Sequence, residues 1–199
     1  MTSPPRLAIF IVDTGPLITL AAAGALDYLL YVEGADIVIP DAVLYEATHD
    51  ASRLGAADIL NWATERRERV EFAPTQTYSL FDAARRVLPG ARQPNLGEQA
   101  AVEVIEQPGR LGPGERGVLL CEESAVLKRI SVLDPDQIVA ISTMDLLRTL
   151  ELEGRIQSAD AVRGWALETG RVASEKEYLP SHSDGVREAI RELVRKPVG

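Results

Sequence analysis

The first apolar run of the chain ends in an aspartate that opens a turn. The six apolar residues 7–12 lead directly into Asp13 and Thr14, and a mostly apolar helical pattern follows over about 16–31. A short continuous apolar run is typical of a buried strand. Thr14 is a residue type that caps helices, so we expect it to cap this one. The pattern therefore predicts a strand that delivers a carboxylate at its carboxyl end.

Further along the chain, strand patterns alternate with helical ones. We expect strands at 7–12, 35–40, 70–72, 118–121 and 137–141. We expect helices at 16–31, 41–49, 52–68, 97–106, 123–130 and 143–152. A turn-rich connector is expected at 109–117. This alternation predicts an α/β fold with a central, mainly parallel sheet.

The last part of the chain contains only helical patterns, at about 158–169 and 184–195. We therefore expect one domain over 1–156 and a helical C-terminal extension over 157–199. Apolar side chains form a stripe along 184–195, and such a stripe must be covered. We expect it to pack on the domain or on a second copy of the chain.

Acidic residues stand at several of the expected element boundaries. They are Asp13, Glu46, Glu98, Glu122 and Glu123. If the strands are parallel, Asp13 and Glu122 leave the same edge of the sheet, where open α/β sheets place their sites. Carboxylates gathered there repel one another unless a divalent cation lies between them. The sequence thus favours a metal-dependent enzyme.

Composition excludes several other classes of protein. The net charge of −9, from 21 basic and 30 acidic residues, argues against a passive nucleic-acid binder. Two distant histidines and the single Cys121 do not form a zinc pattern. The glycine-rich run 112–117 precedes a strand, so it is not a dinucleotide-binding loop. Residues 7–12 are too short for a signal-peptide core, the pattern at 16–31 indicates a buried helix instead of a membrane span, and the absence of disulfides fits a cytoplasmic setting.

Five segments of the chain, taken in order, resemble the PIN-domain nucleases. The segments are 12–18, 39–46, 96–101, 119–123 and 142–147. The resemblance covers roughly 7–156 and is nearest to the subgroup that includes toxins of toxin–antitoxin pairs. It implies a PIN-like three-layer fold with a central parallel sheet.

The resemblance also assigns roles to the acidic residues. Asp13, Glu98 and Glu122 would hold one or two Mg²⁺ or Mn²⁺ ions. Glu46 would bind the metal directly or orient a water molecule. Glu123 is the neighbour that could replace Glu122, and the Thr143 hydroxyl would lie near the metal.

One position departs from the family pattern. Glu122 stands where the family usually has aspartate, and its extra methylene moves the carboxylate by about one bond length. Mg²⁺ demands near-ideal octahedral geometry and responds to such a change. This substitution leaves open a second hypothesis, in which the fold is a catalytically degenerate interaction module. A third hypothesis, a phosphohydrolase of small phosphoesters, is disfavoured because no Asp-x-Asp follows the first strand.

The favoured function is metal-assisted hydrolysis of phosphodiester bonds in single-stranded RNA. The RNA substrate is implied by the resemblance alone. An antitoxin protein and a second copy of the chain are the expected partners, and no membrane is expected. Five basic residues are candidates for contacts with phosphates: Arg85, Arg86, Arg92, Lys128 and Arg129.

Overall fold

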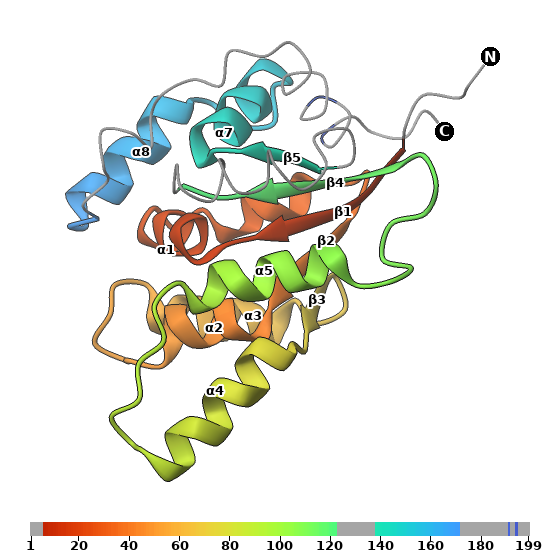
Figure 1. Cartoon of the computed structure of the whole chain (residues 1–199). Helices are drawn as coiled ribbons and strands as arrows, with labels where there is room; N and C mark the ends of the chain where they lie inside the picture. Colours follow the sequence, from red (N-terminus) through yellow and green to blue (C-terminus); the bar gives the residue numbers. More distant parts are fainter. Residues whose placement is uncertain (1–5, 123–137, 172–190, 192–193, 195–199) are drawn as a thin grey trace.

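A five-stranded sheet forms the centre of the protein (Figure 1). The computed structural model describes residues 6–122 and 138–171, together with Arg191 and Val194. The sheet order is β3-β2-β1-β4-β5, and each pair of neighbouring strands is parallel. The strands are β1 (Arg6–Val12), β2 (Asp36–Pro40), β3 (Val70–Ala73), β4 (Glu115–Leu120) and β5 (Ile138–Ile141).

Both faces of the sheet are covered by helices, which confirms the α/β prediction. Along β1, Phe10 and Val12 belong to one apolar core, and Ile9 and Ile11 belong to another. This follows from the alternation of side chains along a strand, and it explains why the strand is apolar at every position from Leu7 to Val12.

Different sets of helices pack on the two faces of the sheet. The larger core receives side chains from α1 (Thr14–Ala22), α3 (Ala56–Glu65), α7 (Thr143–Leu152) and α8 (Ala159–Glu168). On the other face, α5 (Leu96–Glu106) supplies Ala101 and Val104. α2 (Asp41–Thr48) and α4 (Gln76–Val87) pack on α5 through a smaller cluster that includes Ala42 and Phe81.

The single helix expected at 16–31 is wrong. The chain forms α1 and then a separate 3-10 helix, η1 (Leu26–Tyr31). Gly24 between them has φ of +64°, a left-handed conformation that commonly ends a helix and that glycine adopts at little cost. Its backbone N–H donates to the carbonyl of Ala21. One glycine therefore divides the helix that the apolar pattern over 16–31 predicted.

Two further segments differ from expectation. The connector expected at 109–117 ends earlier, because β4 begins at Glu115 and pairs with β1 from its first residue. The helix α4 had no counterpart in the prediction. Its N-cap Thr75 accepts a hydrogen bond from the Tyr78 N–H, and Phe81 is the one residue of the helix that is buried. The helix expected at 123–130 lies outside the described residues.

Part of the C-terminal region packs against the main core. Ala159, Val162 and Ala166 of α8 are buried there. Within the range 184–195 only Arg191 and Val194 are described, and Val194 is buried in the same core. The domain boundary at 156 stays a prediction, since α8 beyond it shares a core with α1.

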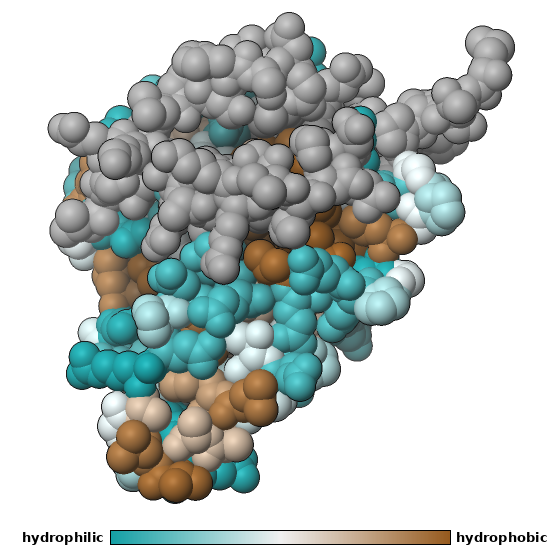
Figure 2. Space-filling view, in the orientation of Figure 1, coloured by the Kyte–Doolittle hydropathy of each residue, from teal (hydrophilic) through white to brown (hydrophobic). Residues whose placement is uncertain are grey.

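The helix α4 projects away from the sheet (Figure 1). Figure 2 shows apolar side chains gathered at its far end, where Leu80, Val87 and Leu88 are exposed. Across the part of the chain that the structure describes, no helix is long and apolar enough to cross a membrane.

Candidate active site

The site lies where the strand order reverses. From the central strand β1 the chain continues to β2 and β3 on one side, and it later returns to β4 and β5 on the other. The carboxyl ends of β1 and β4 are therefore adjacent, and the Asp13 N–H donates to the Leu120 carbonyl at 3.0 Å. Open α/β sheets leave a crevice at such a switch point. Asp13 follows β1 directly, and Glu122 lies two residues beyond the end of β4.

Asp13 and not Thr14 occupies the N-cap position of α1. The expected cap is therefore wrong, because helical geometry already begins at Thr14. The Asp13 side chain makes no capping hydrogen bond to the helix, and it is buried at 8% exposure while lining the cavity. The Thr14 hydroxyl instead donates to Oε2 of Glu46 at 3.0 Å. α1 thus contributes a carboxylate to the site and orients a second one.

A glycine lets the start of α5, which carries Glu98, lie close to Glu46 on α2. Gly97, in the first turn of α5, lies against α1 and α2, where a Cβ atom would stand 2.6 Å from Oε2 of Glu46 and 2.9 Å from Oγ1 of Thr14. Real Cβ atoms essentially never come so close to another heavy atom. The adjacent Glu98 is buried at 7% exposure.

Glu122 is held by two hydrogen bonds. The Thr143 hydroxyl donates to Oε1 at 2.6 Å, and Nη2 of Arg171 donates to Oε2 at 2.9 Å. Thr143 is the first residue of α7, which begins with a capping box formed by Ser142 and Asp145. The capping box fixes the start of α7 and with it the Thr143 hydroxyl. Both oxygens of the Glu122 carboxylate are therefore engaged.

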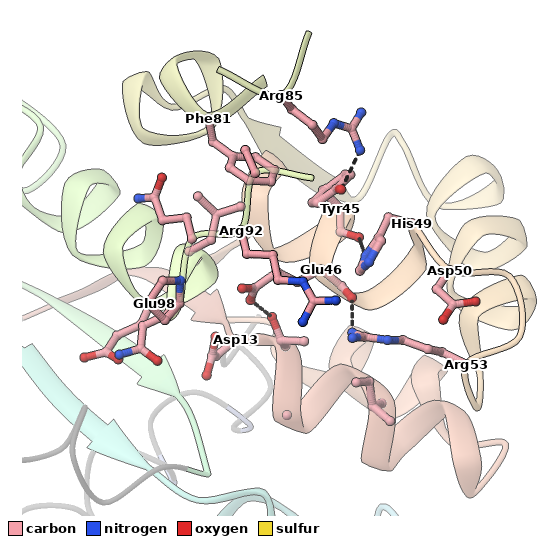
Figure 3. A pocket seen from close by; sticks show the side chains of 18 of the residues that line it. Asp13, Tyr45, Glu46, His49, Asp50, Arg53, Phe81, Arg85, Arg92 and Glu98 are labelled. Atoms are coloured by element: carbon pink, nitrogen blue, oxygen red, sulfur yellow. Dashed lines mark hydrogen bonds between the residues drawn. The ribbon is translucent and has the colours of Figure 1, made fainter. Parts of the chain in front are cut away.

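A cavity of about 1090 Å³ joins these groups. Asp13, Glu46, Glu98 and Glu122 all line it, and Figure 3 shows the first three of them. Thr143 reaches the site through Glu122, whereas Glu123 lies outside the described residues. Four of the six site residues proposed from the sequence thus line one cavity, and a fifth, Thr143, is hydrogen-bonded to one of them.

A comparison with models of protein families gives a match to the first half of the described core. A family model described as a PIN domain matches residues 9–90. Residues 9–90 belong to the PIN-domain family. The search of curated proteins found no match. The matched range contains Asp13 and Glu46 and ends before Glu98 and Glu122, so the structure is what brings the later acids to the site of this PIN domain.

PIN domains are generally dependent on divalent metals, and the donor set here suits such an ion. Asp13, Glu98 and Glu122 are buried carboxylates, and oxygen donors of this kind are those that Mg²⁺ and Mn²⁺ prefer. The spacing is less favourable: among the described residues, no three His, Cys, Asp or Glu side chains are close enough to form a metal-binding group. The residues fit the ion by type but are not close enough together as they stand, and Glu122 would have to exchange the contact with Arg171 for one with the metal.

Sequence reasoning missed several residues of this PIN-domain site. Arg171 follows α8, 49 residues after Glu122, and no sequence motif marks it. Tyr45, His49 and Arg53 line the cavity from α2 and the loop after it. The run from Glu46 to Arg53 is polar, and that is the only signal that could have indicated them.

The basic residues proposed as phosphate contacts divide into three groups. Arg85 and Arg92 line the cavity. Arg86 does not; its exposed side chain pairs with Asp82 at 2.7 Å. Lys128 and Arg129 lie outside the described residues.

Proposed function

We propose that this chain is a metal-dependent nuclease that hydrolyses phosphodiester bonds of single-stranded RNA. One observation carries the proposal: three buried carboxylates, from Asp13, Glu98 and Glu122, line one cavity at the switch point of the sheet. Burying a carboxylate is costly unless it is paired or hydrogen-bonded, and buried carboxylates gathered around one cavity are typical of sites that bind a cation or carry out a reaction. The PIN-domain match over residues 9–90 supports the same class of enzyme.

The side chains of the site have separable roles in this proposal. Asp13 and Glu98 would hold a Mg²⁺ or Mn²⁺ ion, and Glu122 would join them when Arg171 releases it. The bound ion would lower the pKa of a water molecule and stabilise charge on the phosphate. Glu46, oriented by the Thr14 hydroxyl, would accept a hydrogen bond from the attacking water and so direct it.

The second candidate is a degenerate PIN domain that serves as an interaction module. The contacts of Glu122 favour it, because Thr143 and Arg171 together engage both carboxylate oxygens. The guanidinium of Arg171 supplies one positive charge at the place where an active nuclease would use a metal ion. In this candidate the Arg171–Glu122 pair would be a permanent structural contact.

Cleavage of a labelled single-stranded RNA with and without Mn²⁺ distinguishes the two candidates. The nuclease should cleave only with the ion, and Asp13→Asn should reduce the rate by at least 10²-fold, the scale of losing a group that stabilises transition-state charge. Asp36→Asn is the matched control, because Asp36 is exposed at the start of β2. Metal-independent cleavage, or equal rates for the two variants, would contradict the nuclease.

The finer aspects of the function stay predictions. A role as the toxin of a toxin–antitoxin pair, an antitoxin partner and a homodimer are implied by the resemblance to the toxin subgroup. The cytoplasmic location and the choice between Mg²⁺ and Mn²⁺ are also predictions. Purification of the chain alone and together with the product of a neighbouring reading frame would test the partner directly.

A further inference from the structure

The cavity has a second side that is basic and aromatic. We use the term basic wall for five residues of α2, the loop that follows it, α4 and the loop 88–95: Tyr45, His49, Arg53, Arg85 and Arg92. Figure 3 shows Arg92 directed into the cavity and Tyr45 beside His49. The chain has fewer basic than acidic residues, so the three arginines of the basic wall are not the result of a general basic surplus.

A stack of aromatic side chains forms the rigid part of the basic wall. The His49 ring lies 4.6 Å from the Tyr45 ring at an interplanar angle of 19°. Nδ1 of His49 is 3.0 Å from the Tyr45 carbonyl, which fixes the ring orientation. Tyr45 also contacts the buried Phe81 at 5.5 Å between ring centres. Because His49 is exposed, the stack presents a flat, oriented ring at the cavity.

The arginines of the wall are held near this stack. The guanidinium carbon of Arg85 lies 4.8 Å from the centre of the Tyr45 ring, and Nη1 donates to the Tyr45 hydroxyl. Arg53 donates from Nη1 to the backbone carbonyl of Glu46 at 2.8 Å. This bond ties a cationic group to the same residue that supplies a site carboxylate. A guanidinium has five N–H donors, so one such bond leaves capacity for a phosphate.

Carboxylates near the wall offset part of its charge. Asp82 contacts Arg85 at 3.5 Å, but its closer contact, at 2.7 Å, is with Arg86 outside the wall. Asp50 also lines the cavity, and hydrogen bonds from the Ser52 hydroxyl and N–H, together with the charges of Arg53 and His49, hold its pKa below the ordinary value. Asp50 therefore offsets part of the charge of Arg53 and His49, whereas Arg85 shares Asp82 with Arg86.

We propose that the basic wall is a binding subsite for a nucleotide of a single-stranded polynucleotide. Arg85 and Arg92 contact phosphate oxygens, and an unpaired base stacks on the exposed His49 ring. Arginine forks match phosphate geometry, and base stacking on side-chain rings is the usual way to hold single strands. That this nucleotide neighbours the bond under attack rests on the proposed function; the binding itself does not.

Binding of a fluorescein-labelled ten-nucleotide single-stranded RNA tests the subsite. The Asp13→Asn background prevents cleavage during the measurement of anisotropy. We expect Arg92→Gln and His49→Ala each to raise Kd about tenfold, the scale of one stacking or phosphate contact. Each arginine removed should also lower the slope of log Kd against log salt by about 0.7.

Arg86→Gln is the matched control, because Arg86 precedes α4's last residue, is exposed and does not line the cavity. It should change Kd by less than twofold. Arg92 and His49 are exposed, so their variants should fold, and circular dichroism verifies this. An equal effect of all variants would overturn the subsite and indicate a diffuse charge effect.

Three further probes separate the alternatives. A single-stranded DNA of the same sequence should bind within a few-fold of the RNA, because phosphates and base faces are common to both. An RNA duplex that binds more tightly than the single strand would overturn the proposal, since stacking needs an unpaired base. Polyglutamate that competes with the RNA at equal concentration would also overturn it and assign the wall to an acidic protein segment.

The outcome for the subsite is distinguishable from that for the nuclease. If wall variants lose RNA binding and the wild type never cleaves, the subsite stands and the nuclease proposal fails. If the wild type cleaves with Mn²⁺ and the wall variants bind and cleave like it, the nuclease stands and the subsite fails.

Discussion

Arg171 and Glu122, 49 residues apart in the sequence, form an ion pair at the candidate active site, with 2.9 Å between Nη2 and Oε2. Nε of the same arginine donates to Oγ1 of Thr19 on α1 at 3.0 Å. The residue that follows the C-terminal helix α8 is therefore joined to α1 and to the carboxylate after β4. A positive charge from the end of the described core stands beside the buried acids.

Replacement of Arg171 should make the stability of the protein more dependent on bound metal ions. In Arg171→Gln, Glu122 keeps its buried negative charge without its cationic partner. We expect metal-free protein to lose about 2 kcal/mol of stability, less than for a fully buried pair because Arg171 is partly exposed. The rise in melting temperature on addition of Mn²⁺ should be larger than in the wild type. Calorimetry with and without Mn²⁺ measures both changes.

The exposed Arg148 of α7 provides the control for this charge change. Arg148→Gln should leave both melting temperatures close to those of the wild type. If Arg171→Gln responded to Mn²⁺ no more than Arg148→Gln, Arg171 would not stand in for a cation at Glu122. The absence of any Mn²⁺ response in the wild type and in both variants would favour the interaction-module candidate.

Gly97 should be intolerant of a side chain because of Glu46. In Gly97→Ala, the new methyl group would collide with the Glu46 carboxylate and the Thr14 hydroxyl. The end of a glutamate can move, so we expect a stability loss of only about 1 kcal/mol. Activity should fall about tenfold or more, because Glu46 would leave its present position. Steady-state cleavage rates and urea unfolding separate the two effects.

Gly90→Ala is the matched control for that substitution. Gly90 also lines the cavity, but nothing lies within 4 Å of the position that its Cβ would occupy. The variant should retain both stability and activity. A Gly97→Ala protein that cleaves as fast as Gly90→Ala would show that Glu46 is not needed where the structure places it.

Glu103 lies on α5 and accepts hydrogen bonds from the first two residues of α4. It should make the packing of α4 on α5 sensitive to acid. Burial raises the pKa of its carboxyl, but hydrogen bonds from the N–H groups of Thr77 and Gln76 outweigh burial and lower the pKa below 4.5. A lowered folded-state pKa means that the contribution to stability is complete above pH 4.5 and is lost as the pH falls through the lower value. Urea midpoints between pH 3 and 7 should fall at the acid end, and less so in Glu103→Gln. Identical pH profiles would contradict this assignment.

The position of the site could be predicted because it depends on strand ends. Asp13 closes an apolar run, and the parallel order of β1 and β4 brings Glu122 beside it. Runs of apolar residues identify buried parallel strands well, since both faces are covered. The helix α1 was predicted too long, because Gly24 in a left-handed conformation ends it.

Of the basic wall, Arg85 and Arg92 were predicted as phosphate contacts, whereas Tyr45, His49 and Arg53, like Arg171 outside the wall, could not be predicted in the same way. α4 was missed although Leu80, Ala83, Ala84 and Val87 form an apolar stripe at helical spacing; in the structure Leu80 and Val87 are exposed and only Phe81 of the helix is buried. The pairing of Arg171 with Glu122 depends on how α8 packs against α1, which is a tertiary relationship without a local pattern. Such contacts emerge only when the whole core is assembled.

The most direct test of the account is the effect of Mn²⁺ on the melting temperature of the wild type, Asp13→Asn and Asp36→Asn. At a hundredfold excess over Kd, a bound ion stabilises the native state by about 2.7 kcal/mol, a rise of roughly 5–10 °C for a chain of this size. We predict that rise in the wild type and in Asp36→Asn, and the loss of most of it in Asp13→Asn. An equal rise in all three proteins, or no rise in the wild type, would contradict a metal site at Asp13.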